Sequence, residues 1–342
     1  MSTSNVSNLS IQTSMRLTIR QAQNELIKSQ NEVSTGIFYD VGAELGGETA
    51  STLDLTRDGL RLQSMIDTNA IATQRLESSQ ESLSQMSAAA QEMQDALISL
   101  GKSGASTTID VATQTISNAL NTFTSVANTS VGGEYLFAGI NTDVQPLTPY
   151  DATSAAKVAF DTAFASYPWS TPKTAAEMDD FITNVVEPMY SGANWNTDWS
   201  SATDQVMTSR ISQTEVVDTS SSANSRGMRY FALAAVLSKE LLGLDLHDDV
   251  RSVVSEKAIA YTGVAIAGIN SQRTQLGMSQ NRVEKANASL QVQIDILDTT
   301  LKSKIEVDAY DASTRVNNLL ALVEASYTLT SKIQGLSLVN YL

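Results

Sequence analysis

The chain contains no cysteine, which excludes disulfide scaffolds, thiolate metal sites and cysteine nucleophiles. It contains a single histidine, within the acidic stretch Asp245-Leu246-His247-Asp248-Asp249. One histidine beside sequential acids rarely forms a metal or acid/base site, so we interpret this stretch as a solvated helix start capped by Asp248 or Asp249. We therefore expect neither a bound metal nor a cofactor.

Motifs of hydrolytic and nucleotide-binding enzymes are also missing. The sequence has no Gly-x-Ser-x-Gly elbow, and a single histidine leaves little choice of base for a serine nucleophile. The pairs Gly46-Gly47 and Gly132-Gly133 lack the downstream Lys-Ser/Thr of a phosphate loop, so both are predicted to be turns. We conclude from these absences that the chain is not an enzyme.

Basic residues are few, with 22 lysines and arginines against 37 acidic residues and a net charge of −15. Binding to phosphate backbones requires a basic face, so we expect no nucleic-acid partner. No run is apolar and long enough to cross a bilayer, so we expect no membrane partner. The N-terminus lacks the basic start and apolar run of a signal peptide, so export would use a route without a cleaved signal.

Proline and the aromatic residues are scarce and unevenly placed. All five prolines lie between Pro146 and Pro188, and all three tryptophans between Trp169 and Trp199. Because proline interrupts helices, the two proline-free arms are compatible with long helices. The middle of the chain differs in composition from both arms and is predicted to form a separate section.

The first arm shows helical periodicity. A stripe from Met15 to Val33 predicts one helix that ends at Gly36, and a heptad pattern predicts a second from about Thr49 to Leu100. The seam positions of this heptad pattern are Leu55, Asp58, Leu62, Met65, Asn69, Ala72, Leu76, Ser79, Leu83, Met86, Ala90, Met93, Leu97 and Leu100. Its methionines at 65, 86 and 93 are interpreted as core fillers. A third helix is predicted over 110–129.

The middle section and the second arm are predicted to be mixed and then helical. Thr171-Pro172 is interpreted as a helix start, with the helix ending at Pro188, while residues 190–201 are expected to form a loop. Weak alternation over 210–217 predicts a strand or hairpin. Further helices are predicted over 229–242, 250–268, 276–310 and from Val316 to the end. The heptads of 55–100 are expected to pack against 276–310 within one chain.

The two terminal helices are too apolar to remain in water, and each is too narrow to form its own core. We expect them to pair and then to pack against neighbouring subunits. In a free monomer, residues 1–45 and about 306–342 should therefore be disordered. The predicted assembly interface comprises Ile11, Met15, Ile19, Leu26, Val33, Val316, Leu319, Leu320, Val323, Tyr327, Ile333, Leu336, Leu338, Tyr341 and Leu342.

Three segments resemble the flagellin superfamily, and within it the hook-associated proteins that join hook to filament. They are Val33-Ser34-Thr35-Gly36, the Tyr135-Leu136-Phe137-Ala138-Gly139 turn that follows Gly132-Gly133-Glu134, and the C-terminus from Leu322 through the closing Leu336-Ser337-Leu338-Val339-Asn340-Tyr341-Leu342. Residues 273–284 are similar to the long C-terminal rod helix of that family. In place of the usual Ser-Asp-Asp-Pro turn the chain has 43–49, which can still turn through Gly46 and Gly47.

The resemblance implies a mainly α fold, an elongated flagellin-like rod of long antiparallel coiled-coil helices from both termini. The middle of the chain would add a small mixed α/β outer section. The implied domains are an inner core of 1–45 and 306–342, a helical rod of 46–142 and 206–305, and an outer domain of 143–205.

The resemblance also implies an extracellular, non-catalytic subunit of the bacterial flagellum that joins hook to filament. Its partners would be further copies in a ring, another hook-associated protein, flagellin, and a cytosolic export chaperone on the C-terminal helix. Two other interpretations remain open. One is a filament flagellin, and the other is a flagellin-like surface adhesin that binds sugars through Trp169, Trp195 and Trp199.

Overall fold

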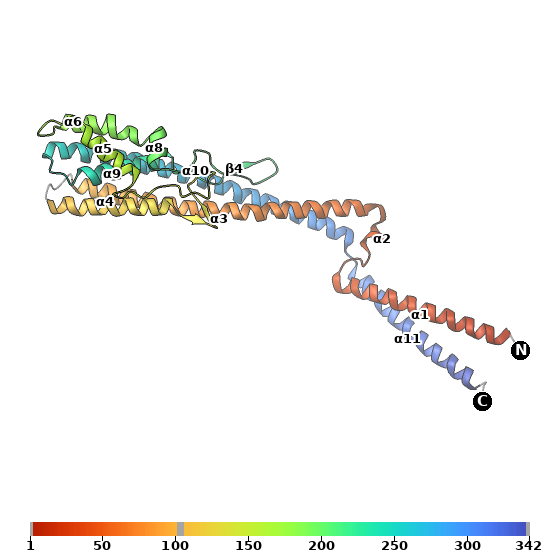
Figure 1. The fold of residues 1–342 in the computed structure, drawn as a ribbon. Helices are drawn as coiled ribbons and strands as arrows, with labels where there is room; N and C mark the ends of the chain where they lie inside the picture. Colours follow the sequence, from red (N-terminus) through yellow and green to blue (C-terminus); the bar gives the residue numbers. More distant parts are fainter. Residues whose placement is uncertain (1–2, 101–105, 340–342) are drawn as a thin grey trace. The chain divides into compact units, whose positions relative to one another are not determined.

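The computed structural model describes residues 3–100 and 106–339 (Figure 1). The chain divides into two compact units, and each is described by itself. The terminal unit comprises residues 1–63 with 291–342, and the central unit comprises residues 64–290. The division falls within two long helices, α3 (Thr49–Leu100) and α10 (Asp248–Ile305).

The terminal unit is built from helices at the two ends of the chain. Besides the first part of α3 and the last part of α10, it contains α1 (Thr3–Thr35), α2 (Val41–Leu45), the short helix η1 (Gly46–Glu48) and α11 (Ala309–Val339). Gly36 has a φ of 75° and follows the last residue of α1, as the sequence predicts. The side chain of Asp40 caps α2 by accepting a hydrogen bond from the Ala43 N–H.

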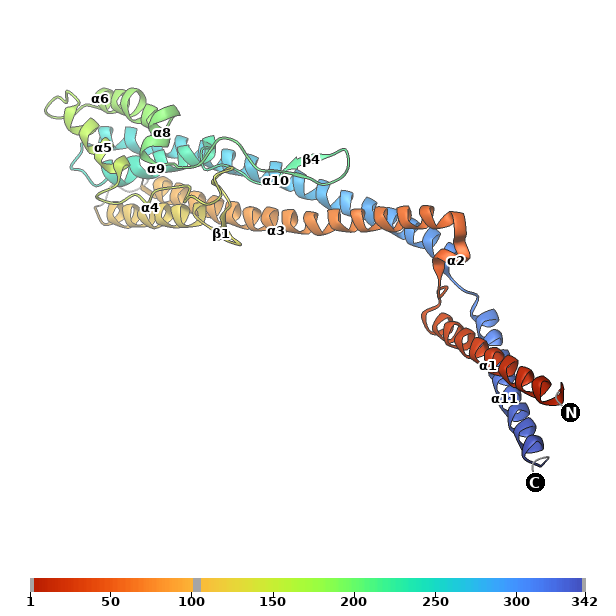
Figure 2. The ribbon, with the colours of Figure 1, turned by 45° about the vertical axis from the view of Figure 1, so that its right-hand side comes forward.

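The central unit adds a helical bundle and two small hairpins. Its elements are α4 (Ser106–Ala127), β1 (Ser130–Val131), β2 (Glu134–Tyr135), α5 (Ala155–Ser166), α6 (Ala175–Asp180), the π-helix η2 (Phe181–Val186), α7 (Glu187–Met189), α8 (Gly192–Asp198), β3 (Thr208–Arg210), β4 (Val216–Asp218) and α9 (Arg226–Leu241). Both strand pairs, β1–β2 and β3–β4, are antiparallel. In the views of Figures 1 and 2, α9 lies between α4 and the helices α5, α6 and α8.

The two hairpins lie where the sequence predicts a turn and a strand or hairpin. Gly132 and Gly133 both have positive φ and form the predicted turn of the β1–β2 hairpin. The β3–β4 hairpin covers the segment in which weak alternation predicts a strand or hairpin. Residues 143–205 contain helices and no named strand, so the strands lie just outside the predicted outer section.

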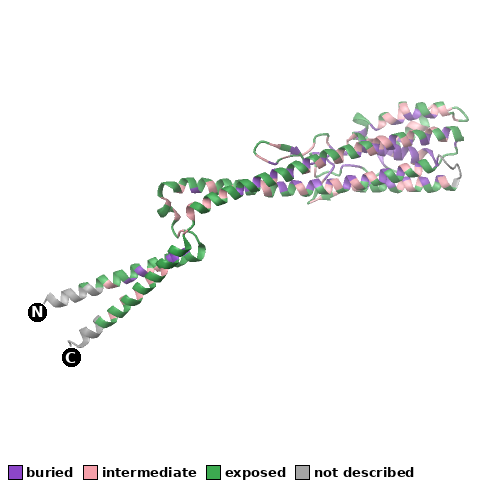
Figure 3. Cartoon of the chain, turned by 180° about the vertical axis from the view of Figure 1, so that it is seen from behind, coloured by how far each residue is buried: buried purple, intermediate pink, exposed green. Residues whose placement is uncertain are grey.

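The predicted heptad seam of α3 packs within the chain. In the central unit all of its positions from Asn69 to Leu100 are buried, including Met86 and Met93, and they form part of the core shown in purple in Figure 3. The side chain of Gln80 donates to the Arg273 carbonyl, and Ser87 lies 3.3 Å from Asn270, so α3 runs antiparallel to α10. The heptads of this unit therefore pack within the chain, as predicted. Asn69 contacts Asn287 inside the predicted partner segment 276–310, whereas Gln80 and Ser87 contact residues just before it.

Two buried polar residues, Asn69 and Ser79, interrupt this seam in the central unit, and Asn69 connects it to other elements. The Nδ2 of Asn69 donates to Asn287 Oδ1 at 2.7 Å and to the Ile211 carbonyl at 2.9 Å. A buried amide in an apolar helical seam favours one register, because a shifted register would leave the amide unpaired. Asn69 therefore ties α3 both to α10 and to the end of the β3–β4 hairpin.

Aromatic side chains fill the core around the middle section. Trp195 and Trp199 are stacked with centroids 5.6 Å apart, and Trp199 also stacks on Tyr150. Trp195 is 1% exposed and Trp199 is 3% exposed, so both indoles are core residues. Only Trp169, which is half-buried beside Phe181, remains accessible enough to support sugar stacking.

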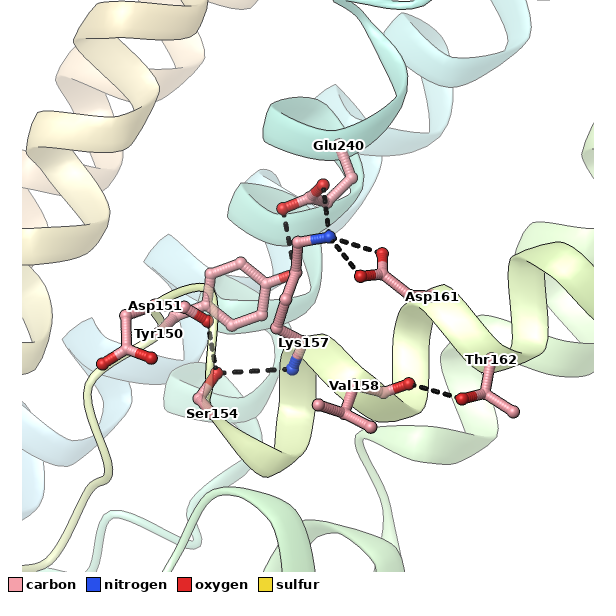
Figure 4. A network of polar contacts seen from close by, with 8 residues as sticks. All are labelled: Tyr150, Asp151, Ser154, Lys157, Val158, Asp161, Thr162 and Glu240. Atoms are coloured by element: carbon pink, nitrogen blue, oxygen red, sulfur yellow. Dashed lines mark hydrogen bonds and ion pairs between the residues drawn. The ribbon is translucent and has the colours of Figure 1, made fainter.

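A polar network connects α5 to α9 (Figure 4). The hydroxyl of Tyr150 donates to Glu240 Oε1 at 3.0 Å, and Lys157 forms ion pairs with both Asp161 and Glu240. Burial alone would lower the pKa of Lys157, but its hydrogen bond to Asp161 and the charge of Glu240 together raise it. Burial, together with the neighbouring Glu240, raises the pKa of the Tyr150 phenol.

Three predicted boundaries are wrong. The helix in the middle section begins after Thr174, whose side chain forms a capping box with Glu177, while Thr171–Pro172 is a cis peptide before it. Residues 192–198 form α8 rather than a loop. The predicted helices over 250–268 and 276–310 are one helix, α10, which ends at Ile305. The residues between the two predicted helices are mostly polar and exposed or half-buried, and they continue the helix without a break.

Candidate assembly surface

The terminal helices α1 and α11 lie side by side in Figures 1 and 2, as the sequence predicts. The Nε2 of Gln23 donates to the Tyr327 hydroxyl at 2.8 Å, and Arg315 lies 3.4 Å from Glu32 Oε2. The later residue of α1, Glu32, contacts the earlier residue of α11, Arg315. The two helices are therefore antiparallel.

The end of this pair nearest Gly36 is held by backbone hydrogen bonds. The Val307 N–H donates to the Gly36 carbonyl and the Phe38 N–H donates to the Ile305 carbonyl, each at 3.0 Å. Glu32 is buried there, and its Oε1 accepts from the Tyr39 N–H at 3.3 Å. This carboxylate joins α1 to the following loop and, through its other oxygen, to α11.

A second ion pair lies in the terminal unit where α3 begins and α10 ends. Lys304 Nζ lies 2.6 Å from Glu48 Oε2. The hydrogen bond from Lys304, followed by its charge, lowers the pKa of Glu48. Because both groups are near solvent, the contact orients the η1 turn more than it stabilises the fold.

The predicted apolar stripes face the seam between the two helices. Ile19 and Ala22 of α1 and Ala312 of α11 are buried, although the pair has no other layer over it in this unit. The half-buried members of the predicted interface are Met15, Leu26, Val316, Leu319 and Val323. Their spacing of three and four residues is that of a two-helix seam.

Other large apolar side chains of the pair face solvent. Leu17 is 57% exposed and Ile27 is 55% exposed on α1, while Leu322 is 46% exposed and Leu329 is 49% exposed on α11. Three members of the predicted interface, Val33, Leu320 and Tyr327, are exposed as well. Groups of exposed apolar side chains on a folded chain mark surfaces that contact other molecules. Tyr327 already contacts Gln23 of α1 through its hydroxyl, so we give the name outer apolar set to the other six residues: Leu17, Ile27, Val33, Leu320, Leu322 and Leu329.

The structure thus divides the predicted interface residues into those in the α1–α11 seam and those that are exposed. It also shows four further exposed apolar residues on the two helices. Leu17, Ile27, Leu322 and Leu329 are not in the predicted interface, because they lie off the periodic stripe that the prediction followed. Their signal in the sequence is a second set of apolar residues on an already amphipathic helix. The side chains of Ile11, Ile333, Leu336 and Leu338, and all of Tyr341 and Leu342, lie outside the described residues.

The charge of the chain is low on these two helices. Helix α1 carries three basic and two acidic side chains, and α11 carries two of each, whereas the whole chain has a net charge of −15. Self-repulsion between copies is therefore weakest at this pair. The outer apolar set can approach a second copy without first overcoming a large like-charge field.

The pair should open more readily than the central unit, because few of its side chains are buried. Brief trypsin digestion of the monomer is expected to cleave first beside Arg16, Arg20, Lys28 and Arg315 and to leave a helical fragment of the central unit. Mass spectrometry of the first products measures this order. The same sites should be protected in assembled material, and terminal helices that resist digestion in the monomer would contradict the expectation.

The stretch around His247 is the other candidate site considered from the sequence. His247 is exposed, directly precedes α10, and lies 3.5 Å from Asp249; Asp248 is the first residue of the helix rather than its cap. Across residues 3–100 and 106–339, no cluster of three or more metal-ligating side chains is found. None of the described helices is long and apolar enough to cross a membrane.

Two family models match the chain. The bacterial flagellin N-terminal helical region matches residues 6–142, and the bacterial flagellin C-terminal helical region matches residues 259–342. Together they match well over half of the chain, including most of the N-terminal arm and the C-terminal part of the second arm, so the chain belongs to the flagellin family. This family is structural and non-catalytic, and its members are components of the bacterial flagellum outside the cell. The chain is accordingly a structural flagellar protein rather than an enzyme.

Solved structures share the fold at low sequence identity. A protein of Vibrio parahaemolyticus assigned as a flagellar hook-associated protein is 11% identical with a TM-score of 0.55, covering 77% of this chain and 99% of that one. The flagellar hook-associated protein 3 of Legionella pneumophila is 10% identical with a TM-score of 0.53, covering 73% and 97%. No curated protein matches the sequence significantly. These likenesses show that the chain has the fold of such proteins.

Proposed function

We propose that the chain is the subunit that joins hook to filament in the bacterial flagellum. It would act mechanically, as a ring of copies between two tubes whose subunits pack differently. The observation that carries this proposal is the outer apolar set, which leaves large apolar side chains exposed on more than one side of an α1–α11 pair of low net charge. The seam of the pair would hold the two helices together, and the outer apolar set would contact neighbouring subunits.

We propose three domains for the assembled subunit. Residues 1–45 and 306–342 would form the inner core of the ring, and residues 46–142 with 206–305 the rod around it. Residues 143–205 would form the outer domain. The partners would be a second hook-associated protein on the hook side, flagellin on the filament side, and an export chaperone that covers the C-terminal helix before secretion without a cleaved signal.

A junction subunit is favoured over a filament flagellin by two observations. The fold covers nearly the whole length of two hook-associated proteins, and the closing residues from Leu336 to Leu342 resemble that subfamily. The filament alternative is supported by the two flagellin family matches, which do not separate the subfamilies. The adhesin alternative retains only Trp169, since the other two tryptophans are buried.

Immunogold labelling of isolated flagella tests the proposal directly. A junction subunit is expected to be labelled in one narrow band between hook and filament, whereas a filament flagellin would be labelled along the whole length. Purified protein under polymerising conditions provides a second test. Short rings or monomers are expected in electron micrographs, and long tubes formed from this chain alone would exclude the junction role.

A further inference from the structure

A cavity of about 470 Å³ lies in the central unit between the α6–α7 segment and α9. This volume is in the range of pockets that bind small molecules in proteins. The cavity is not part of the α1–α11 pair, and the assembly argument does not use it. Its lining residues are Thr183, Glu187, Pro188, Tyr190, Ser191, Arg226, Arg229, Tyr230 and Leu233.

Two arginines on one side of α9 line this cavity without carboxylate partners. Arg226 and Arg229 are three residues apart, so they share a helix face. Among the described residues neither forms an ion pair, whereas two other arginines of the central unit do: Arg75 pairs with Glu134 and Arg251 with Asp248. The Nε of Arg229 is buried and has no hydrogen-bond partner.

The one carboxylate in the cavity is occupied by tyrosines. Glu187 Oε1 accepts from the Tyr230 hydroxyl at 2.8 Å, and its Oε2 accepts from the Tyr261 hydroxyl at 2.7 Å. Burial first, and then the bond to Glu187, raises the pKa of both phenols, so they remain neutral donors. Both oxygens of Glu187 therefore already accept a hydrogen bond from a tyrosine.

The same contacts fix the position of one arginine. The Arg226 guanidinium lies 5.2 Å from the centroid of the Tyr230 ring, a cation–π arrangement. Because Glu187 holds that ring by its hydroxyl, the guanidinium is oriented before any ligand arrives. A pre-oriented guanidinium loses little conformational freedom when it binds an oxyanion.

The rest of the lining is apolar or weakly polar. Leu233, Pro188 and Tyr190 supply an apolar wall, and the hydroxyls of Thr183 and Ser191 lie at its margin. Thr183 already accepts from Lys257 and Ser191 donates to the Pro188 carbonyl, so the groups left for an anion are the guanidiniums, including the unpartnered Nε of Arg229. An anion with a small carbon body would satisfy them and contact the wall at the same time.

We propose that this cavity binds a small organic acid of about monosaccharide size through Arg226 and Arg229. The carboxylate of the ligand accepts hydrogen bonds from the two guanidiniums, which is a charge-assisted contact. The carbon skeleton of the ligand lies against Leu233 and Tyr190. Neither the assembly proposal nor the family of the chain requires such a site.

Titration calorimetry on the full chain with two matched probes tests the site. Glucuronate and glucose differ at one carbon, which is a carboxylate in the first and a hydroxymethyl group in the second. We expect saturable binding of glucuronate, no detectable binding of glucose, and competition by inorganic sulfate for the oxyanion contact. Equal binding of both sugars, or binding of sulfate without glucuronate, would overturn the proposed ligand class.

Variants then assign the binding to the cavity. Arg226→Gln and Arg229→Gln should each weaken glucuronate binding about tenfold or more, because each removes a charge-assisted hydrogen bond. Arg210→Gln, an exposed arginine of β3 outside the cavity, should leave the affinity unchanged. Arg226 is itself exposed, so its variant keeps the fold, which circular dichroism can check. Unchanged affinity in Arg226→Gln would overturn the assignment.

Discussion

Replacing Leu17 and Ile27 by glutamate is expected to abolish incorporation of the chain into flagella while leaving the monomer folded. Both side chains are more than half exposed, so the monomer loses little burial when they become charged. At a subunit contact the same two carboxylates would be buried without partners. Burying an unpaired charge costs several kcal/mol per group even after relaxation, which exceeds what one small contact supplies.

Incorporation can be measured by immunoblotting flagella from a strain that lacks the wild-type gene and expresses the variant. The matched control is the pair Ile71→Glu and Val111→Glu, which changes the charge equally at residues of the central unit that are 72% and 67% exposed. The control is expected to be incorporated, and both proteins should melt at wild-type temperature. Normal incorporation of the Leu17 and Ile27 variant would show that the outer apolar set does not form the proposed subunit interface.

Gly227→Ala is expected to destabilise the central unit by about 3 kcal/mol or more. Helices α9 and α10 approach each other closely at Gly227 and Gly268. A Cβ added to Gly227 would lie 2.6 Å from the Ile269 nitrogen, and one added to Gly268 would lie 2.5 Å from the Gly227 Cα. The obstructing atoms are backbone atoms, so no side-chain rotation can relieve the contact and the helices must separate. Neighbouring buried residues of α9 would then lose packing.

Gly263→Ala is the matched control, because Gly263 lies on α10 five residues before Gly268. A Cβ there would meet only the end of Gln94, at 3.9 Å. This variant should keep or raise stability, since alanine is favoured over glycine in a helix by about 1 kcal/mol. Urea unfolding followed by circular dichroism compares the two variants with wild type. An unchanged midpoint in Gly227→Ala would mean that the approach of α9 to α10 is not as close as the structure has it.

The long helices could be predicted from the sequence because their signals are local and repeated. The heptads from Leu55 to Leu100 fix a period over many turns, and α3 begins and ends where the sequence predicts. The short elements of the middle section could not be placed as well. Thr171-Pro172 has the composition of a helix start, but the capping box at Thr174 begins α6. Thr171 and Thr174 have similar local preferences for a helix start. Only the packing of the apolar residues that follow decides which of them begins the helix.

The candidate site illustrates a second limit of periodicity. The prediction followed the dominant stripe, which includes Met15 and Ile19, and the structure places that stripe in the seam between α1 and α11. Leu17 and Ile27 lie off the stripe, so the pattern alone assigns them no role. An apolar residue shows that some partner is needed, but its position in a helix does not say whether that partner is in the same chain or another.

By itself, the sequence determined that this is a chain of long helices from two arms, with terminal segments like those of flagellins. These features depend on composition and on spacing along one helix, which are local. Only the tertiary structure decided which apolar residues are used inside the chain. It also brought Arg226, Arg229 and Glu187 to one cavity and Gly227 against Gly268, because such contacts depend on how distant helices pack and leave no periodic trace in either helix.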